Sequence, residues 1–149
     1  MKIIIEDDLY ITDNINVVES KIYIKDNMFC FPNNKWTDFV FPMLEEWKTN
    51  LLNVRFSDNV SFKLYFHDGP FWLEVYKTSD NDLEIECING RTNNSEITIQ
   101  CKYYEFLNCI YDAMKRFSKI LFEHQMNKGK FESIYRQTLL SIRELKDIL

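Results

Sequence analysis

The stretch that decides the fold is Val60–Lys77, VSFKLYFHDGPFWLEVYK. Apolar and polar residues alternate on both sides of the tetrapeptide His67–Pro70, and a period of two is typical of strands with one buried face. Asp68 and Gly69 are common turn residues, and Pro70 keeps Gly69 out of the helical region. The stretch therefore predicts a β-hairpin whose loop is His67–Pro70.

This loop also predicts which residues face each other across the hairpin. The predicted pairs are Phe66 with Phe71, Leu64 with Leu73, Phe62 with Val75, Tyr65 with Trp72, Lys63 with Glu74, and Ser61 with Tyr76. The first three pairs form a continuous apolar face. The others include an aromatic pair and an opposite-charge pair, each of which contributes about 0.2–1 kcal/mol. Because a shift by one residue would turn the whole apolar set outward, we expect that set in the core.

Similar alternation recurs before and after the hairpin. The further predicted strands are Ile3–Ile5, Leu9–Ile11, Lys21–Lys25, Met28–Phe31, Leu83–Cys87 and Ile97–Cys101. The pair Asp26-Asn27 suits a tight turn that places Lys25 opposite Met28. The short connections from Val60 onward are typical of an antiparallel meander.

Three segments have the helical period of about 3.6 residues. The predicted helices follow Trp36 to about Asn53, run from Lys102 to a stop at Gly129, and occupy Phe131–Leu149. Thr37 or Asp38 is expected to cap the first helix by accepting hydrogen bonds from its free N–H groups. Glu45, Glu46 and Lys48 are expected on its solvent side.

These patterns predict an α+β fold. We expect an antiparallel sheet of about five to seven strands, built from the N-terminal strands and then a three- to four-stranded meander. One helix follows the first hairpin, and two C-terminal helices pack on one face. With 149 residues and only 3 Gly and 3 Pro, the chain is expected to form a single domain, residues 1–149.

The composition excludes several classes of function. The net charge of −5 argues against nucleic-acid binding, which needs clustered positive charge, and favours a basic partner. The cysteines form no C-x-x-C pair and lie apart from both histidines, so we expect reduced thiols and no metal or cofactor. The short apolar run Met1–Ile5 is too brief for a secretion signal, and no stretch is long enough to span a membrane. We therefore expect a cytoplasmic protein with no membrane partner.

Two candidate chemical sites are weak. His67 and Asp68 form the only histidine–carboxylate neighbours, but side chains of adjacent residues diverge at a strand end and no nucleophile is placed nearby. We assign Asp68, Gly69 and Pro70 to the turn, with Asp68 capping the loop backbone, and expect no catalytic residue. An acidic strip on the sheet lacks the ligand loop of a divalent-cation site. The strip comprises Glu74, Glu84, Glu86 and Glu96.

The second face of the sheet is the candidate partner-binding surface. Its predicted binding residues are Tyr65, Trp72, Tyr76, Glu74, Glu84 and Glu86; Lys63 and Gln100 lie beside them on the same face. We call this set of six the aromatic–acidic face. Aromatic anchors within a polar rim are typical of protein interfaces. In the alternative interpretation, the N-terminal segment or a second copy of the chain covers these aromatic residues.

Two motifs resemble those of small uncharacterised bacterial proteins. They are Trp36-Thr37-Asp38-Phe39 followed by Trp47, a W-x-D-F…W pattern, and Phe66-His67-Asp68-Gly69-Pro70, an F-x-D-G-P pattern. Some proteins of this type look like immunity proteins of polymorphic toxin systems. The resemblance covers Trp36–Val75, about a third of the chain, and brings no catalytic residues with it.

The resemblance and the second face together give the predicted function. We expect a non-enzymatic protein-binding module, most concretely an immunity protein that neutralises a bacterial toxin domain. One alternative is a small-ligand-binding protein or enzyme with a pocket near the His67-Asp68 turn. Another is a structural homodimer that buries the same aromatic residues.

Overall fold

The computed structural model describes residues 1–12 and 17–149. The strands are β1 (Lys2–Thr12), β2 (Val17–Asp26), β3 (Phe29–Phe31), β4 (Thr37–Phe39), β5 (Val60–Tyr65), β6 (Phe71–Lys77), β7 (Asp82–Asn89) and β8 (Asn94–Lys102). The helices are α1 (Val40–Asn53), α2 (Tyr103–Glu123) and α3 (Glu132–Ile148), with the 3₁₀ turn η1 (Gly129–Phe131) before α3. The predicted α+β class is confirmed.

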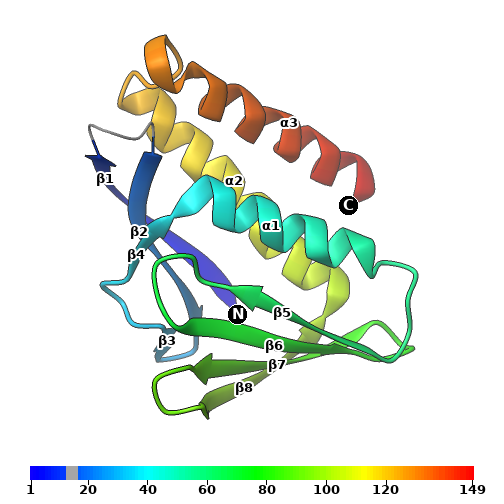
Figure 1. The fold of residues 1–149 in the computed structure, drawn as a ribbon. Coiled ribbons are helices and arrows are strands. Elements are labelled where there is room, and N and C mark those ends of the chain that lie inside the picture. The colour runs from blue at the N-terminus through cyan, green and yellow to red at the C-terminus, as the bar shows by residue number, and fades with distance from the viewer. Residues whose placement is uncertain (13–16) are drawn as a thin grey trace.

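The strands form two antiparallel sheets rather than the single sheet expected. In the four-stranded sheet A, β1, β2 and β3 are neighbours and β4 also pairs with β2; the four-stranded sheet B is the meander β5-β6-β7-β8. Helix α1 follows β4 directly and carries the chain away from sheet A before β5 begins (Figure 1). Alternation specifies which neighbouring strands pair, but not whether two groups of strands share a ladder, so this division was not predictable from the pattern.

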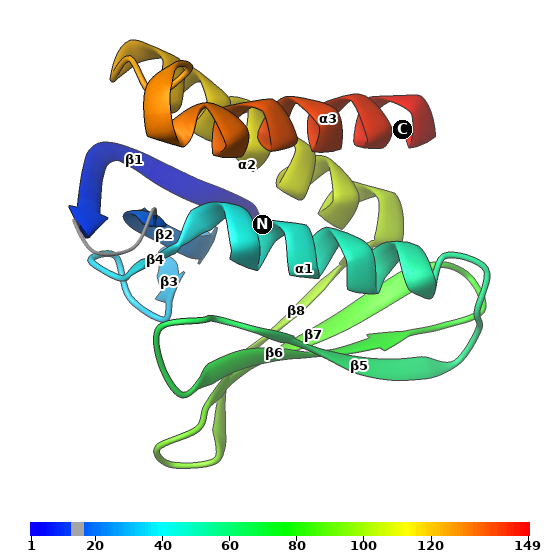
Figure 2. The same cartoon turned by 45° about the horizontal axis from the view of Figure 1, so that its top comes forward.

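The helices lie in two layers on one side of sheet B. Helices α1 and α2 cover the inner face of sheet B, and α2 also lies along β1 (Figures 1 and 2). Helix α3 runs antiparallel to α2 on the side away from the sheet, so it forms an outer layer (Figure 1). Within the described residues, no helix combines the length and apolarity that crossing a membrane requires.

The central hairpin has the predicted register. Tyr65 pairs with Trp72, Lys63 with Glu74, and Phe62 with Val75. The N–H of Phe66 donates to the carbonyl of Phe71 at 3.0 Å, which closes the loop where the sequence placed it. The apolar side is core as expected: Phe62 is half-buried, and the buried members are Leu64, Phe66, Phe71, Leu73 and Val75.

The predicted pairing of β2 with β3, which placed Lys25 opposite Met28, is wrong by two residues. Lys25 pairs with Cys30 and Asp26 with Phe29, so the turn is Asn27-Met28 rather than Asp26-Asn27. Asn27 has φ of 52°, a left-handed conformation that asparagine tolerates better than most residues. Because a shift by two preserves the faces of a strand, the expected core residues stay inside. Ile22, Ile24 and Phe31 are all buried.

Both predicted helix boundaries that relied on single residues are wrong. Helix α1 has Phe39 at its N-cap and no side-chain cap, because Thr37 and Asp38 belong to β4. Helix α2 ends at Glu123 rather than at Gly129, and Gln125 takes the left-handed φ of 59°. The N–H of Met126 donates to the carbonyl of Leu121 at 2.8 Å, and the buried Met126 side chain joins the core. Core packing therefore ends the helix early.

Lys48 is buried, contrary to the solvent position expected for it. Its side chain joins α1 to α3: Nζ lies 2.7 Å from Glu45 and 2.6 Å from Glu144, and it donates to Ser141 Oγ at 3.2 Å. Burial opposes the charged form, but the bonds to Glu144 and Glu45 outweigh it and raise the pKa of Lys48. The lysine stays charged because every donor has an acceptor.

We expect the Tyr103 hydroxyl, which joins α2 to the end of α1, to contribute measurably to stability. This buried hydroxyl donates to the carbonyl of Leu51 at 2.7 Å. Tyr103→Phe removes one buried hydrogen bond, so we expect the free energy of unfolding in urea to fall by about 1–2 kcal/mol. Tyr104→Phe on the exposed side of the same helix is the matched control and is expected to change it by less than about 0.5 kcal/mol. Equal effects of the two changes would contradict this assignment.

Candidate functional site

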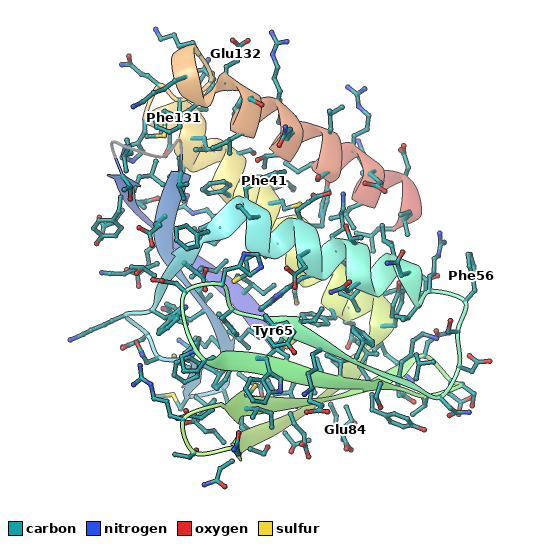
Figure 3. All side chains as sticks on the ribbon, viewed as in Figure 1. Phe41, Phe56, Tyr65, Glu84, Phe131 and Glu132 are labelled. Carbon is teal, nitrogen blue, oxygen red and sulfur yellow. The ribbon has the colours of Figure 1, made fainter. Side chains whose placement is uncertain are left out.

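The aromatic–acidic face lies on the side of sheet B opposite the helices. No described element covers it (Figures 1 and 2). Figure 3 shows Glu84 extending from the sheet away from the helices. Tyr65 is 46% exposed and Tyr76 is 40% exposed, whereas Trp72 is half-buried. The structure therefore brings the predicted residues together on one open surface.

Trp72 lies at the loop end of this surface, opposite Tyr65 on β5 and Ile88 on β7, and is held from several sides. The Lys63 ammonium lies 5.1 Å from the centroid of its indole ring, a cation–π contact, and the Tyr65 ring centroid lies 6.2 Å away. The indole N–H donates to Glu74 at a long 3.5 Å. These contacts fix the ring before any partner arrives.

Gly90 is the supporting residue that the sequence did not reveal. Its N–H donates to the carbonyl of Pro70 at 2.6 Å. A Cβ at this position would lie 2.5 Å from that carbonyl oxygen and 2.6 Å from the Trp72 ring, so only glycine fits without movement. The sequence shows only a glycine just after β7. That this glycine packs against Pro70 and Trp72 is evident only from the structure.

The negative charges of the three glutamates on the face are not neutralised by ion pairs among the described residues. Glu74 stands directly opposite Glu86 in the β6–β7 pairing. Like charges in this position destabilise a sheet. Although Lys63 faces Glu74 across β5 and β6, its ammonium lies over the indole, and none of the three glutamates forms an ion pair within residues 1–12 and 17–149. Glu84 accepts one neutral hydrogen bond from Gln100 at 2.7 Å.

Asp38, rather than Asp68, caps the His67–Pro70 loop. Its buried carboxylate accepts from the backbone N–H groups of His67 at 3.0 Å, Asp68 at 3.3 Å and Phe39 at 2.7 Å, and from the Trp36 indole N–H at 3.0 Å. The side chain of Asp68 is exposed. The assignment of the capping role to Asp68 is therefore wrong, because the loop N–H groups point toward β4.

Trp36 and Trp47 complete the same unit. A Cβ on Gly69 would lie 2.5 Å from the ring of Trp36, so this ring packs directly on the turn. Trp47 donates its indole N–H to the carbonyl of Tyr65 at 2.8 Å. The W-x-D-F…W residues thus surround the F-x-D-G-P turn, and their contacts hold the turn in place.

His67 is paired but not placed in a pocket. Its Nε2 lies 2.9 Å from Glu46, on α1. Two cavities of about 280 and 300 Å³ open instead between α1 and α3 and share Phe41, Glu45 and Gln137 in their linings. The pocket that the enzyme alternative requires is therefore not among these cavities.

No metal centre is present among the residues that the structure describes. In the acidic strip, Glu96 accepts instead from the Asn89 amide at 3.0 Å. The four free cysteines are Cys30, Cys87, Cys101 and Cys109. Burial raises the pKa of Cys87 and of Cys101 to about 12, so both are protonated and weakly nucleophilic near neutral pH.

Comparisons with protein-family models, with curated proteins and with solved structures found no match to this chain. The resemblance to immunity proteins therefore stays a prediction. What the structure adds is a physical role for the residues that carry it. Asp38 and Trp36 hold the turn, and the turn fixes one end of the aromatic–acidic face.

We expect Asp38→Ala to be strongly destabilising. The change leaves several buried N–H groups without an acceptor, so the free energy of unfolding should fall by about 2–4 kcal/mol. Asp68→Ala, at an exposed position of the same loop, is the control and is expected to cost less than about 0.5 kcal/mol. Urea unfolding followed by tryptophan fluorescence measures both; a larger loss in the Asp68 variant would contradict the reassigned cap.

Asp38 also predicts a pH dependence of stability. Burial raises its pKa above the ordinary 3.8, although hydrogen bonds from Trp36, Phe39 and Asp68 act in the opposite direction. The native state then binds this proton more tightly than the unfolded state. Stability due to Asp38 therefore rises as the pH falls from the raised pKa toward 3.8, and is level below it. Asparagine does not titrate, so Asp38→Asn lacks this gain. As the pH is lowered from about 7 to about 4, the unfolding free energy of the wild type should therefore rise relative to that of Asp38→Asn.

Proposed function

We propose that this chain is a non-enzymatic protein-binding module whose aromatic–acidic face binds a basic surface on another protein. The single observation that carries the proposal is the opposition of Glu74 and Glu86 beside exposed aromatic rings. This arrangement does not stabilise the sheet, because like charges directly opposite each other on neighbouring strands are destabilising. A basic partner would convert the repulsion into attraction.

The aromatic residues suit the role of anchors. Tyrosine and tryptophan supply most of the binding energy in many protein interfaces. Trp72 is already fixed by Lys63 and Gly90, so little side-chain freedom remains to be lost when a partner covers it. Tyr65 lies opposite it on β5, and Tyr76 lies four residues further along β6; both rings are exposed.

Charge supports both the choice of partner and the speed of association. The chain carries a net charge of −5, and two of its lysines, Lys48 and Lys77, are buried inside the protein. Lys48 is committed to Glu45 and Glu144 elsewhere in the protein, whereas the three glutamates of the aromatic–acidic face form no ion pair among the described residues. Such a surface attracts a positively charged partner and accelerates its encounter at low salt.

The most concrete form of the proposal is an immunity protein that neutralises a bacterial toxin domain. The support for this form is the resemblance carried by the W-x-D-F…W and F-x-D-G-P motifs. In this role, the face would occupy a basic cleft of the toxin, with Trp72 inserted as the anchor and the glutamates paired with lysine or arginine.

The test uses the product of the gene directly upstream, titrated with the purified chain by calorimetry. We expect binding, and we expect Trp72→Ala to weaken it at least about 30-fold, as truncation of an aromatic anchor does. Glu74→Lys and Glu86→Lys are each expected to weaken binding, and the loss of affinity should be larger at low salt than at high salt. Asp147→Lys, an exposed change of equal charge on α3, is the matched control and should leave the affinity unchanged.

Two outcomes would contradict the proposal. If the Trp72 and glutamate variants bind the partner as tightly as the wild type, the face is not the binding surface. If Trp72→Ala instead turns a dimer of this chain into a monomer, the face joins two copies, as in the homodimer alternative. Circular dichroism of each variant would show that the fold is retained.

A further inference from the structure

Strand β8 is an open edge of sheet B. It pairs with β7 alone, and among the described residues no other strand bonds to its free side. The opposite edge, β5, is partly blocked because the Tyr65 carbonyl accepts from Trp47. The nine residues of β8 contain no proline. At its end the Lys102 N–H already donates to the Glu105 carboxylate at 2.9 Å, which leaves the edge before Lys102 as a template on which another strand can add.

The sequence of β8 is complementary to itself when read in the opposite direction about Ile99. In that register the pairs between two copies are Glu96 with Lys102, Ile97 with Cys101, Thr98 with Gln100, and Ile99 with Ile99. Polar residues meet polar residues on the outer side, and apolar residues meet apolar residues on the inner side. The Glu96–Lys102 pair occurs twice by symmetry.

Other registers lose these matches. Centring the pairing on Thr98 places Glu96 against Gln100 and Lys102 against Asn94, so both ion pairs disappear. A shift that reverses the faces would set the apolar side chains of one copy against the polar ones of the other. Ile97 and Cys101 are only half-buried on the inner side of β8, so a neighbouring strand would cover them.

The side chains at the two ends are accessible. Glu96 is exposed and lies at the bulge where β8 has one residue more than β7, which limits pairing beyond it. Lys102 is 58% exposed and bonds to Asp82 at 2.5 Å on β7. An exposed ammonium can share a second carboxylate, so the existing pair does not prevent the new one.

We propose that two copies of this chain associate through antiparallel pairing of their β8 strands, in the register centred on Ile99. The two four-stranded sheets B then form one sheet of eight strands about a twofold axis perpendicular to it. Since both copies keep the same side inward, their helices lie on one side and both aromatic–acidic faces lie on the other. The association is independent of the proposed function and leaves that face uncovered, unlike a dimer formed through Trp72.

The first test is sedimentation velocity of the full chain over a range of concentrations. We expect a monomer–dimer equilibrium whose dissociation constant rises about tenfold in Glu96→Lys, because two attractive pairs become repulsive. Glu74→Lys makes the same change of charge two strands away and is expected to leave the equilibrium unchanged. A monomer at every concentration would overturn the proposal, as would a dimer that Glu96→Lys leaves intact.

The second test fixes the register by disulfide cross-linking. Thr98 of one copy faces Gln100 of the other, so a mixture of Thr98→Cys and Gln100→Cys chains should cross-link under mild oxidation. Each variant alone should cross-link far less, because its new thiols are not opposite each other. Stronger cross-linking of Thr98→Cys alone would overturn this register in favour of one centred on Thr98. The wild type controls for the native cysteines.

Discussion

The carboxylate of Asp38 is the contact on which the arrangement of the two sheets depends. It sits in β4 of sheet A and accepts from the N–H groups of His67 and Asp68, in the loop of sheet B. Aromatic packing reinforces the same junction: Phe31 lies edge-on to Phe66 and Phe71, with ring centroids 5.6 and 5.7 Å apart. A buried carboxylate is costly unless its oxygens accept hydrogen bonds. Only an arrangement that brings these N–H groups to Asp38 meets this condition, so the junction is specific as well as stable.

This junction also positions the side chains at one end of the outer face. The loop is held by Asp38, the Pro70 carbonyl receives the N–H of Gly90, and the Trp72 ring rests against Gly90. An interior contact thus positions an exposed side chain through a short chain of neighbours. The same hairpin supplies core residues to one side and an open aromatic surface to the other, because its side chains alternate.

The buried lysines and the acids of the outer face differ in how they are paired. Buried lysines are satisfied inside the protein: Lys77 donates to the Ser57 carbonyl at 2.5 Å, and Lys48 is held by two glutamates. The acids of the outer face have no comparable partners in the described part of the chain. The free edge at β8 adds unsatisfied backbone groups beside them. The surface features that point to association therefore gather on one side and one edge of a single sheet.

The sequence by itself determined the α+β class, the central hairpin with its register, and the face that carries Tyr65, Trp72 and Tyr76, because alternation and turn chemistry act between near neighbours. Only the tertiary structure decided the division into two sheets, the burial of Lys48, the end of α2 and the capping role of Asp38. Each of these depends on contacts between residues distant in the chain: Asp38 and His67 are 29 positions apart, and Lys48 and Glu144 are 96 apart. A local pattern contains no information about such partners, since the packing of whole elements brings them together.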